Sequence, residues 1–164
     1  MNQFNLQEAI SRSLATERSA MRFYQLGAGQ MKDQDARRVF LTLAGEERTH
    51  AEMFFKIYQG GDIPSFDKFM DSPADNEANW VAALNVLLSD GFTEKKALEM
   101  AMTNEKNLES SLRETAAQIS EPSVREIFEL NARETHNHYL MIESEYARLM
   151  GMVHESDMDT FVRE

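Results

Sequence analysis

Five ionisable residues lie where the sequence otherwise places core-facing apolar side chains. They are Glu17, Glu47, His50, Glu105 and His138, each within an apolar row that recurs at helical spacing. A buried carboxylate is costly unless it is paired with a cation or bound to a metal. Glu47 and His50 stand three residues apart, so on a helix they share a face, where the carboxylate could bridge two metals while the imidazole binds one. These residue types therefore indicate a metal site.

An internal repeat relates these residues to one another. Sliding the sequence on itself by 88 residues places Glu17 on Glu105 and His50 on His138. The same shift matches flanking pairs: Arg37 with Arg125, Phe40 with Phe128, Ala44 with Ala132 and Glu46 with Glu134. Chance matches between amphipathic helices are common, but here the ionisable residues inside the apolar rows match as well. The repeat predicts two similar helical hairpins.

Apolar spacing predicts long helices and no strand, so the expected fold class is all-α. The expected helices cover about 5–31, from 36 to a stop at Gly60 and Gly61, from Thr93 to about 119, and from Pro122 to just before Gly151. The connection at 62–91 is long and is expected to carry a short helix at 78–89. Two hairpins joined by one long crossover form a four-helix bundle.

Positions along the chain predict that the five groups lie in one layer of the bundle. The first helix turns into the second near residue 33, and Glu17 and residue 49 are equally far from that turn. The third helix turns into the fourth near residues 121 and 122, and Glu105 and His138 are equidistant from it. In antiparallel hairpins, equal distance from the turn means equal height. Three carboxylates and two imidazoles are therefore expected to converge in one dry layer.

The composition limits the possible functions. The 28 Asp and Glu residues outnumber the 17 Lys and Arg residues, and the net charge of −11 argues against a nucleic-acid partner. With no cysteine, a metal must be held by oxygen and imidazole nitrogen. The longest apolar run, 80–84, is too short to span a membrane, and no leader pattern is present, so we expect a cytoplasmic protein without a membrane partner. The expected domain is 1–151, followed by a polar tail at 152–164.

Two segments resemble a known family. The stretches LATERSAMRFY (14–24) and LAGEERTH (43–50) are similar to the first two helices of the rubrerythrin and ferritin-like di-iron proteins. The resemblance implies a ferritin-like four-helix bundle that binds two irons through one Glu from each of two helices and Glu-x-x-His from each of the other two. Glu17 and Glu105 would be the single-helix ligands, His50 and His138 the paired histidines, and Glu47 a carboxylate that bridges the metals. Manganese or zinc could replace iron in such a ligand set.

The sequence departs from the family pattern at position 135. The repeat predicts a Glu three residues before His138, but the residue is Thr135, and Glu134 stands one position earlier. The full family site offers four carboxylates, which balance two divalent ions. This chain offers three unless Glu134 turns inward, which leaves one formal positive charge for water, hydroxide or an added anion.

Three functions are compatible with these observations. The first is a di-iron oxidoreductase that reduces peroxide or oxygen; because the chain lacks the cysteine-bound iron of rubrerythrins, a separate donor protein would supply its electrons. The second is ferritin-type oxidation, handling or storage of iron. The third is a non-catalytic helical bundle with a partly degraded metal site. We expect the chain to form a homo-oligomer, with a dimer favoured.

Several other residues have simpler interpretations. Tyr24 lies on the same apolar row as the first acidic residue and could lie near the metals, but we interpret it as a core aromatic. Trp80 is expected to anchor the short crossover helix. Glu46 and Glu134 are interpreted as outer or surface acids rather than ligands. His136 has no counterpart in the repeat and is expected on the surface.

Overall fold

The computed structural model describes residues 3–73 and 79–162, with side chains described up to 73 and from 80 to 151. Its helices are α1 (Leu6–Gln30), α2 (Gln34–Ile57), α3 (Phe66–Asp71), α4 (Asn79–Asp90), α5 (Glu94–Ala117) and α6 (Pro122–Val162). No strand occurs in these ranges, which confirms the all-α fold class. No helix in this part of the chain is long and apolar enough to cross a membrane.

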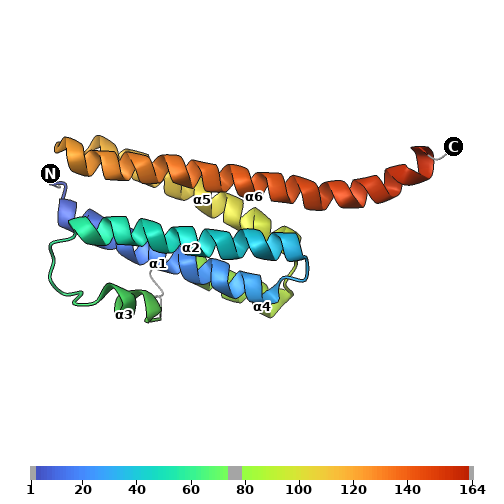
Figure 1. Cartoon of the computed structure of the whole chain (residues 1–164), viewed down its shortest axis with the longest axis horizontal. Coiled ribbons are helices and arrows are strands. Elements are labelled where there is room, and N and C mark those ends of the chain that lie inside the picture. The colour runs from blue at the N-terminus through green and yellow to red at the C-terminus, as the bar shows by residue number, and fades with distance from the viewer. Residues whose placement is uncertain (1–2, 74–78, 163–164) are drawn as a thin grey trace.

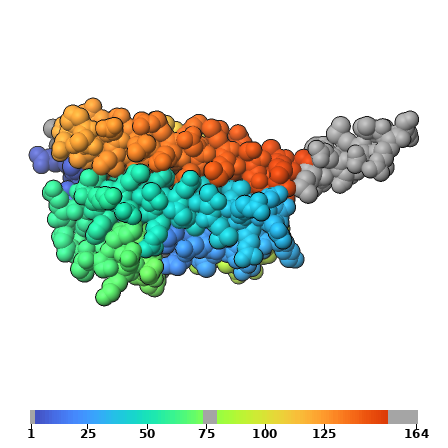
Figure 2. Space-filling model, in the orientation of Figure 1, coloured from blue at the N-terminus to red at the C-terminus, as the bar shows by residue number. Residues whose placement is uncertain are grey.

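The long helices form two antiparallel hairpins that lie against each other, α1 with α2 and α5 with α6 (Figure 1). The segment between the hairpins runs along the bundle and contains α3 and α4 (Figure 1). In the space-filling view, the side chains of α2 and α6 meet along the face shown (Figure 2). The structure therefore has the predicted layout of two hairpins and one crossover.

Side-chain caps fix where the long helices begin. The side chain of Asn5 accepts a hydrogen bond from the backbone N–H of Glu8 at 3.1 Å. Asp33 caps α2 in the same way through Ala36 N at 3.0 Å. The predicted start at Thr93 is confirmed, because its hydroxyl accepts from Lys96 N at 3.2 Å. Each such cap contributes about 1 kcal/mol to helix stability.

Two features of the fold differ from the sequence prediction. The expected end of the last helix before Gly151 is wrong, because α6 continues to Val162. A glycine inside a helix costs only about 1 kcal/mol relative to alanine, so it does not by itself end one. The positive φ angles of described glycines are instead at Gly61 (76°) and Gly91 (115°), in the connections. The helix α3 was not predicted, and the expected crossover helix is observed as α4, although residue 78 lies outside the described residues.

An aromatic cluster attaches the crossover to the first hairpin. The ring of Trp80 on α4 lies 5.6 Å from that of Phe23 and 5.9 Å from that of Tyr24, both in edge-to-face geometry. Tyr24 also meets Phe40 edge-to-face at 4.9 Å. Edge-to-face pairs of this kind add to the stabilisation that burial provides. The contacts agree with the interpretation of Trp80 as the anchor of the crossover helix.

Two arginines of α1 hold the end of α3. The guanidinium of Arg18 donates to the carbonyl of Phe69 at 3.2 Å, and that of Arg22 donates to the carbonyl of Met70 at 3.2 Å. These carbonyls belong to the last turn of α3, where the carbonyl of Phe69 also accepts from the backbone N–H of the C-cap residue Ser72. The short helix is thus stabilised by residues about fifty positions away in the sequence.

The first prediction concerns the contact between α1 and α2 at Gly27. A Cβ atom at Gly27 would lie 2.7 Å from Cε2 of the buried Phe40 ring, whereas one at Gly45 in the middle of α2 would meet nothing within 4 Å. Gly27→Ala should destabilise the protein by about 1–3 kcal/mol through overpacking. Gly45→Ala, the matched control, should stabilise it by up to about 1 kcal/mol through helix propensity. Denaturant unfolding measures both, and a Gly27→Ala variant as stable as the parent would contradict this packing.

Candidate metal centre

The five predicted residues come from the four long helices. Glu17 lies on α1, Glu47 and His50 on α2, Glu105 on α5 and His138 on α6. All five side chains are buried, and the most exposed, that of His138, retains only 3 % of its accessible surface. Phe40 precedes this layer on α2 and Phe54 follows it, and both rings are fully buried. The layer is therefore enclosed by apolar packing along the helix axis.

The donor atoms of these residues approach one another in two sets that share Glu47. In the first, Nδ1 of His50 lies 3.8 Å from Oε2 of Glu17 and 3.8 Å from Oε2 of Glu47. In the second, Nδ1 of His138 lies 2.8 Å from Oε1 of Glu47 and 3.6 Å from Oε1 of Glu105. The structure thus brings all five predicted residues together. The two sets correspond under the repeat, with Glu47 between them.

These separations suit transition-metal ions. Metal bonds to imidazole nitrogen and carboxylate oxygen are about 2.0–2.2 Å long, so two donors on one ion are at most about 4.4 Å apart. The four distances from histidine nitrogen to carboxylate oxygen in the two sets are 3.8 Å or less. Donor atoms of Glu47, His50 and His138 lie within 4.8 Å of one another, so both histidines lie near the same carboxylate. The nitrogen–oxygen distances within each set are compatible with binding to a common ion.

Several of these donor atoms lack a hydrogen-bond partner, which also supports metal binding. Both carboxylate oxygens of Glu17 and of Glu47, one oxygen of Glu105, and Nδ1 of His50 and of His138 are buried without a hydrogen-bond partner. Leaving a buried polar atom unpaired costs about 1–3 kcal/mol, more when it is charged. A metal ion bound between these side chains would satisfy these atoms. The residues therefore fit a resident metal.

The outer nitrogen of each imidazole contacts an acid from the other hairpin. Nε2 of His50 on α2 lies 3.2 Å from Oε2 of Glu134 on α6. In return, Nε2 of His138 on α6 lies 2.9 Å from Oε2 of Glu46 on α2. A carboxylate on the outer nitrogen fixes the orientation of a ligating histidine and directs its other nitrogen to the metal. Glu134 therefore lies on the outer side of the histidine and does not turn inward.

The sequence alone left two interpretations of Glu46 and Glu134: acids on the surface, or acids that contact the ligands from outside. The 88-residue repeat was the available signal, since it pairs Glu46 with Glu134 as it pairs His50 with His138. What it could not show is that each acid crosses to the histidine of the other hairpin. The two imidazole rings stack nearly parallel, 5.1 Å apart and inclined by 9°.

Tyr24 does more than fill the core. Its buried hydroxyl donates a hydrogen bond of 2.6 Å to Oε1 of Glu105. The interpretation as a core aromatic was incomplete, because position 24 on the row of Glu17 also brings the hydroxyl to the acidic layer. By contrast, His136 is half exposed and pairs with Glu109 at 2.9 Å, in agreement with the expected surface position.

Burial and mutual proximity shift the pKa values of these groups. Burial, with the charge of Glu47, raises the pKa of Glu17 well above its usual range. The same two causes raise the pKa of Glu105 to about 7. Burial alone would lower the pKa of each histidine, but the neighbouring carboxylates outweigh it and raise that of His50 to about 11 and that of His138 to about 10. In the metal-free layer, protons thus take the place of a metal cation.

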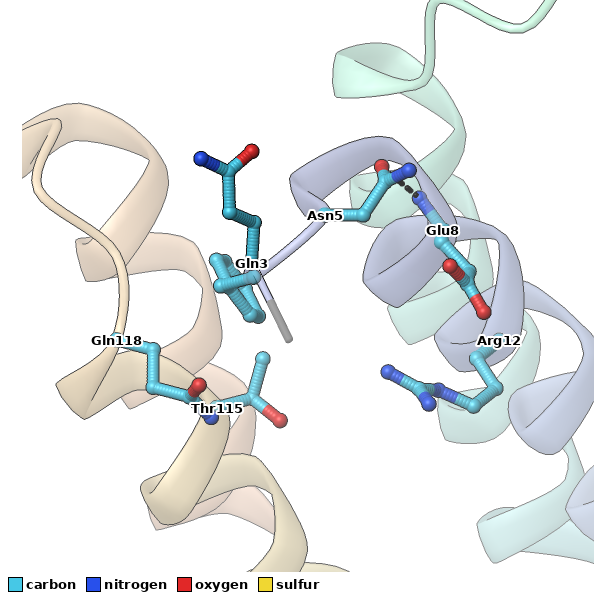
Figure 3. Close-up of a pocket in the computed structure, with 7 residues that line it drawn as sticks. Gln3, Asn5, Glu8, Arg12, Thr115 and Gln118 are labelled. Atoms are coloured by element: carbon cyan, nitrogen blue, oxygen red, sulfur yellow. Dashed lines mark hydrogen bonds between the residues drawn. The ribbon is translucent and has the colours of Figure 1, made fainter. Parts of the chain in front are cut away.

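A surface groove lies away from this layer. It has a volume of about 730 Å³ and lies between the start of α1 and the end of α5 (Figure 3). Its lining residues are Gln3, Phe4, Asn5, Glu8, Arg12, Thr115 and Gln118. A neighbouring groove of about 290 Å³ extends along the same two helices as far as Thr16 and Leu108. None of the five residues lines either groove, so the acidic layer is closed towards both.

Comparison with known proteins identifies one family. The family model described as Rubrerythrin matches residues 8–146, which include all five residues of the layer. No curated protein and no solved structure matches the chain. The match confirms the resemblance inferred from residues 14–24 and 43–50.

The second prediction concerns the metal-free protein. A group with a raised folded-state pKa stabilises the fold fully below its unfolded pKa and loses that contribution as pH rises through its folded pKa. For Glu105 this window runs from 4.5 to about 7, and for His138 from 6.5 to about 10. The melting temperature after chelation should therefore fall by roughly 5–10 °C between about pH 5 and pH 9.

Two controls accompany this measurement. Saturating divalent metal should reduce the fall, because the ion then neutralises the carboxylates in place of protons. Glu105→Gln should reduce it in the metal-free protein, because the amide does not titrate. A melting temperature that rises over this pH range would contradict the account.

Proposed function

The chain belongs to the rubrerythrin family, and we propose that it binds two iron ions in the acidic layer and uses them to reduce hydrogen peroxide. The observation that carries this proposal is the pair of donor sets that share Glu47. Glu17, Glu47 and His50 would hold one ion, and Glu47, Glu105 and His138 the other. Oxygen and imidazole donors suit iron or manganese, and zinc could compete through its higher affinity.

Two ferrous ions in this layer would together supply the two electrons that convert one peroxide and two protons into two waters. The chain's own residues determine what reaches them. The layer is buried among apolar neighbours, which would limit the access of bulk water and of large molecules. The hydroxyl of Tyr24 fixes the carboxylate of Glu105. Glu46 and Glu134 fix the two imidazoles from outside.

The reaction would need an external source of electrons. The chain has no cysteine and so cannot hold a thiolate-bound iron for electron entry. We infer that a separate donor protein returns the centre to its reduced state. We further propose a homo-oligomer, with a dimer favoured, acting in the cytoplasm.

Ferritin-type oxidation and storage of iron is the second candidate function, since the same ligands could oxidise ferrous ion. It would require a large hollow assembly. Native mass spectrometry separates the two functions: a small oligomer with two irons per chain supports the peroxidase proposal, whereas a cage supports storage. A protein without metal would support the third alternative, a helical bundle with a partly degraded site.

The third prediction concerns metal content. The double variant Glu47→Ala/His50→Ala should lose most of its iron, because Glu47 belongs to both donor sets and His50 to one. The matched control is Glu109→Ala/His136→Ala, which removes a partly exposed Glu–His pair at 2.9 Å outside the layer and should retain its iron. Elemental analysis measures both variants. Equal iron in the first variant and the parent would exclude this layer as the site.

The fourth prediction concerns the reaction. The reduced, iron-loaded protein should consume about one peroxide for every two ferrous ions, and it should do so faster than with an equivalent amount of oxygen. Stopped-flow absorbance at the ferric charge-transfer bands and a peroxide assay measure the stoichiometry. The Glu47→Ala/His50→Ala variant serves as the control. Iron that reacts rapidly with oxygen but not with peroxide would favour the ferritin-type function.

A further inference from the structure

Thr135 differs from four other threonines in the long helices. The hydroxyls of Thr16, Thr49, Thr103 and Thr115 each donate to the carbonyl four residues earlier, at 2.9–3.3 Å. Thr135 is fully buried on α6, yet its hydroxyl has no hydrogen-bond partner. A buried hydroxyl without a partner is costly, and the carbonyl of its own helix would be the easiest one to use. This hydroxyl is therefore available to a partner from outside its own helix.

The repeat places Thr135 beside the acidic layer. It corresponds to Glu47, the carboxylate that lies between the two imidazoles, and it stands three residues before His138 on the same helix face. A threonine side chain ends at its hydroxyl, two bonds closer to the helix than a glutamate carboxylate. The second hairpin thus supplies no carboxylate at the position that corresponds to Glu47.

The charges of the layer indicate what would fill it. Two divalent ions bring four positive charges, and Glu17, Glu47 and Glu105 bring three negative ones. Glu134 does not supply the fourth inside the layer, because its carboxylate contacts the outer nitrogen of His50. An uncompensated charge in a buried layer is unfavourable, so a further negative charge of small size would be stabilised there.

Resting on the proposed two-metal function, we propose that a small monoanion binds the metal pair at the position of the missing carboxylate and accepts a hydrogen bond from the hydroxyl of Thr135. For the proposed reaction, the matching monoanion would be hydroperoxide, which forms when hydrogen peroxide releases one proton to solvent. Thr135 would then act as a substrate-binding residue.

Azide is a suitable probe, because it is a small monoanion with visible absorption when it binds cobalt(II) or iron(III). The experiment loads the parent protein with cobalt(II), confirms the metal content, and titrates azide by absorbance and calorimetry. We expect one azide per metal pair. Thr135→Ser should retain this affinity. Thr135→Val, which keeps the shape and removes the donor, should weaken it by about 10- to 100-fold.

Thr135→Glu should abolish azide binding, because its carboxylate supplies the fourth charge itself, and should tighten binding of the second metal. Thr103→Val removes a hydroxyl that already bonds within α5 and should leave azide affinity unchanged. Thermal melting with metal verifies that each variant is folded, and Thr135→Val provides a test that does not depend on the folding of Thr135→Glu.

The outcomes separate this inference from the proposed function. If the parent binds two metals and azide equally well with or without the Thr135 hydroxyl, the inference is wrong and the two-metal function stands. If the metal-loaded parent binds only water at this position, the inference is also wrong. If the parent binds no metal, the proposed function fails, and the inference fails with it.

Discussion

The burial of three carboxylates and two imidazoles in one layer is the constraint on which the rest of the structure depends. Glu47 is central to it, because each of its oxygens faces a different histidine. The groups come from four separate helices, so the layer exists only when both hairpins are assembled. Unpaired charges at this depth are unfavourable, and the packing around the layer must therefore compensate for them. Phe40 and Phe54 on either side of it along α2, together with Phe128 against Phe54, provide that packing.

The polar contacts across the hairpins are as specific as the apolar ones. Each histidine receives its outer carboxylate from the opposite hairpin, so α2 and α6 exchange equivalent interactions. These acids are about half exposed, and their net stabilisation is correspondingly small. Their main effect is to orient each imidazole, because a carboxylate at Nε2 leaves Nδ1 facing the layer. A second contact between the hairpins joins Arg148 of α6 to Asp33, at 2.7 Å, beside the turn between α1 and α2.

The sequence predicted the five residues of the layer, the two hairpins and the crossover helix. Helical spacing and the 88-residue repeat are both visible in the sequence without a structure. The short helix α3 was not, since its last turn is stabilised by Arg18 and Arg22 from a distant helix. The continuation of α6 beyond Gly151 was missed because the sequence does not show whether a glycine adopts a positive φ angle. Gly151 does not, so it stays inside the helix. The crossing of Glu46 and Glu134 to the opposite histidines depends on how the hairpins are placed against each other, which no residue pattern specifies. The identity of the five residues as metal ligands stays a prediction.

The two donor sets differ in how they are distributed over the hairpins. Glu17, Glu47 and His50 all belong to the hairpin of α1 and α2. In the second set, Glu105 and His138 belong to the other hairpin, and only Glu47 comes from the first. Thr135 is the reason, because the second hairpin has no central carboxylate of its own. An ion in the first set could keep its ligands while the hairpins part, but an ion in the second set could not. The residence time of the second ion would then follow the opening rate of the bundle, and the two positions would exchange metal on different timescales even though their ligand types are alike.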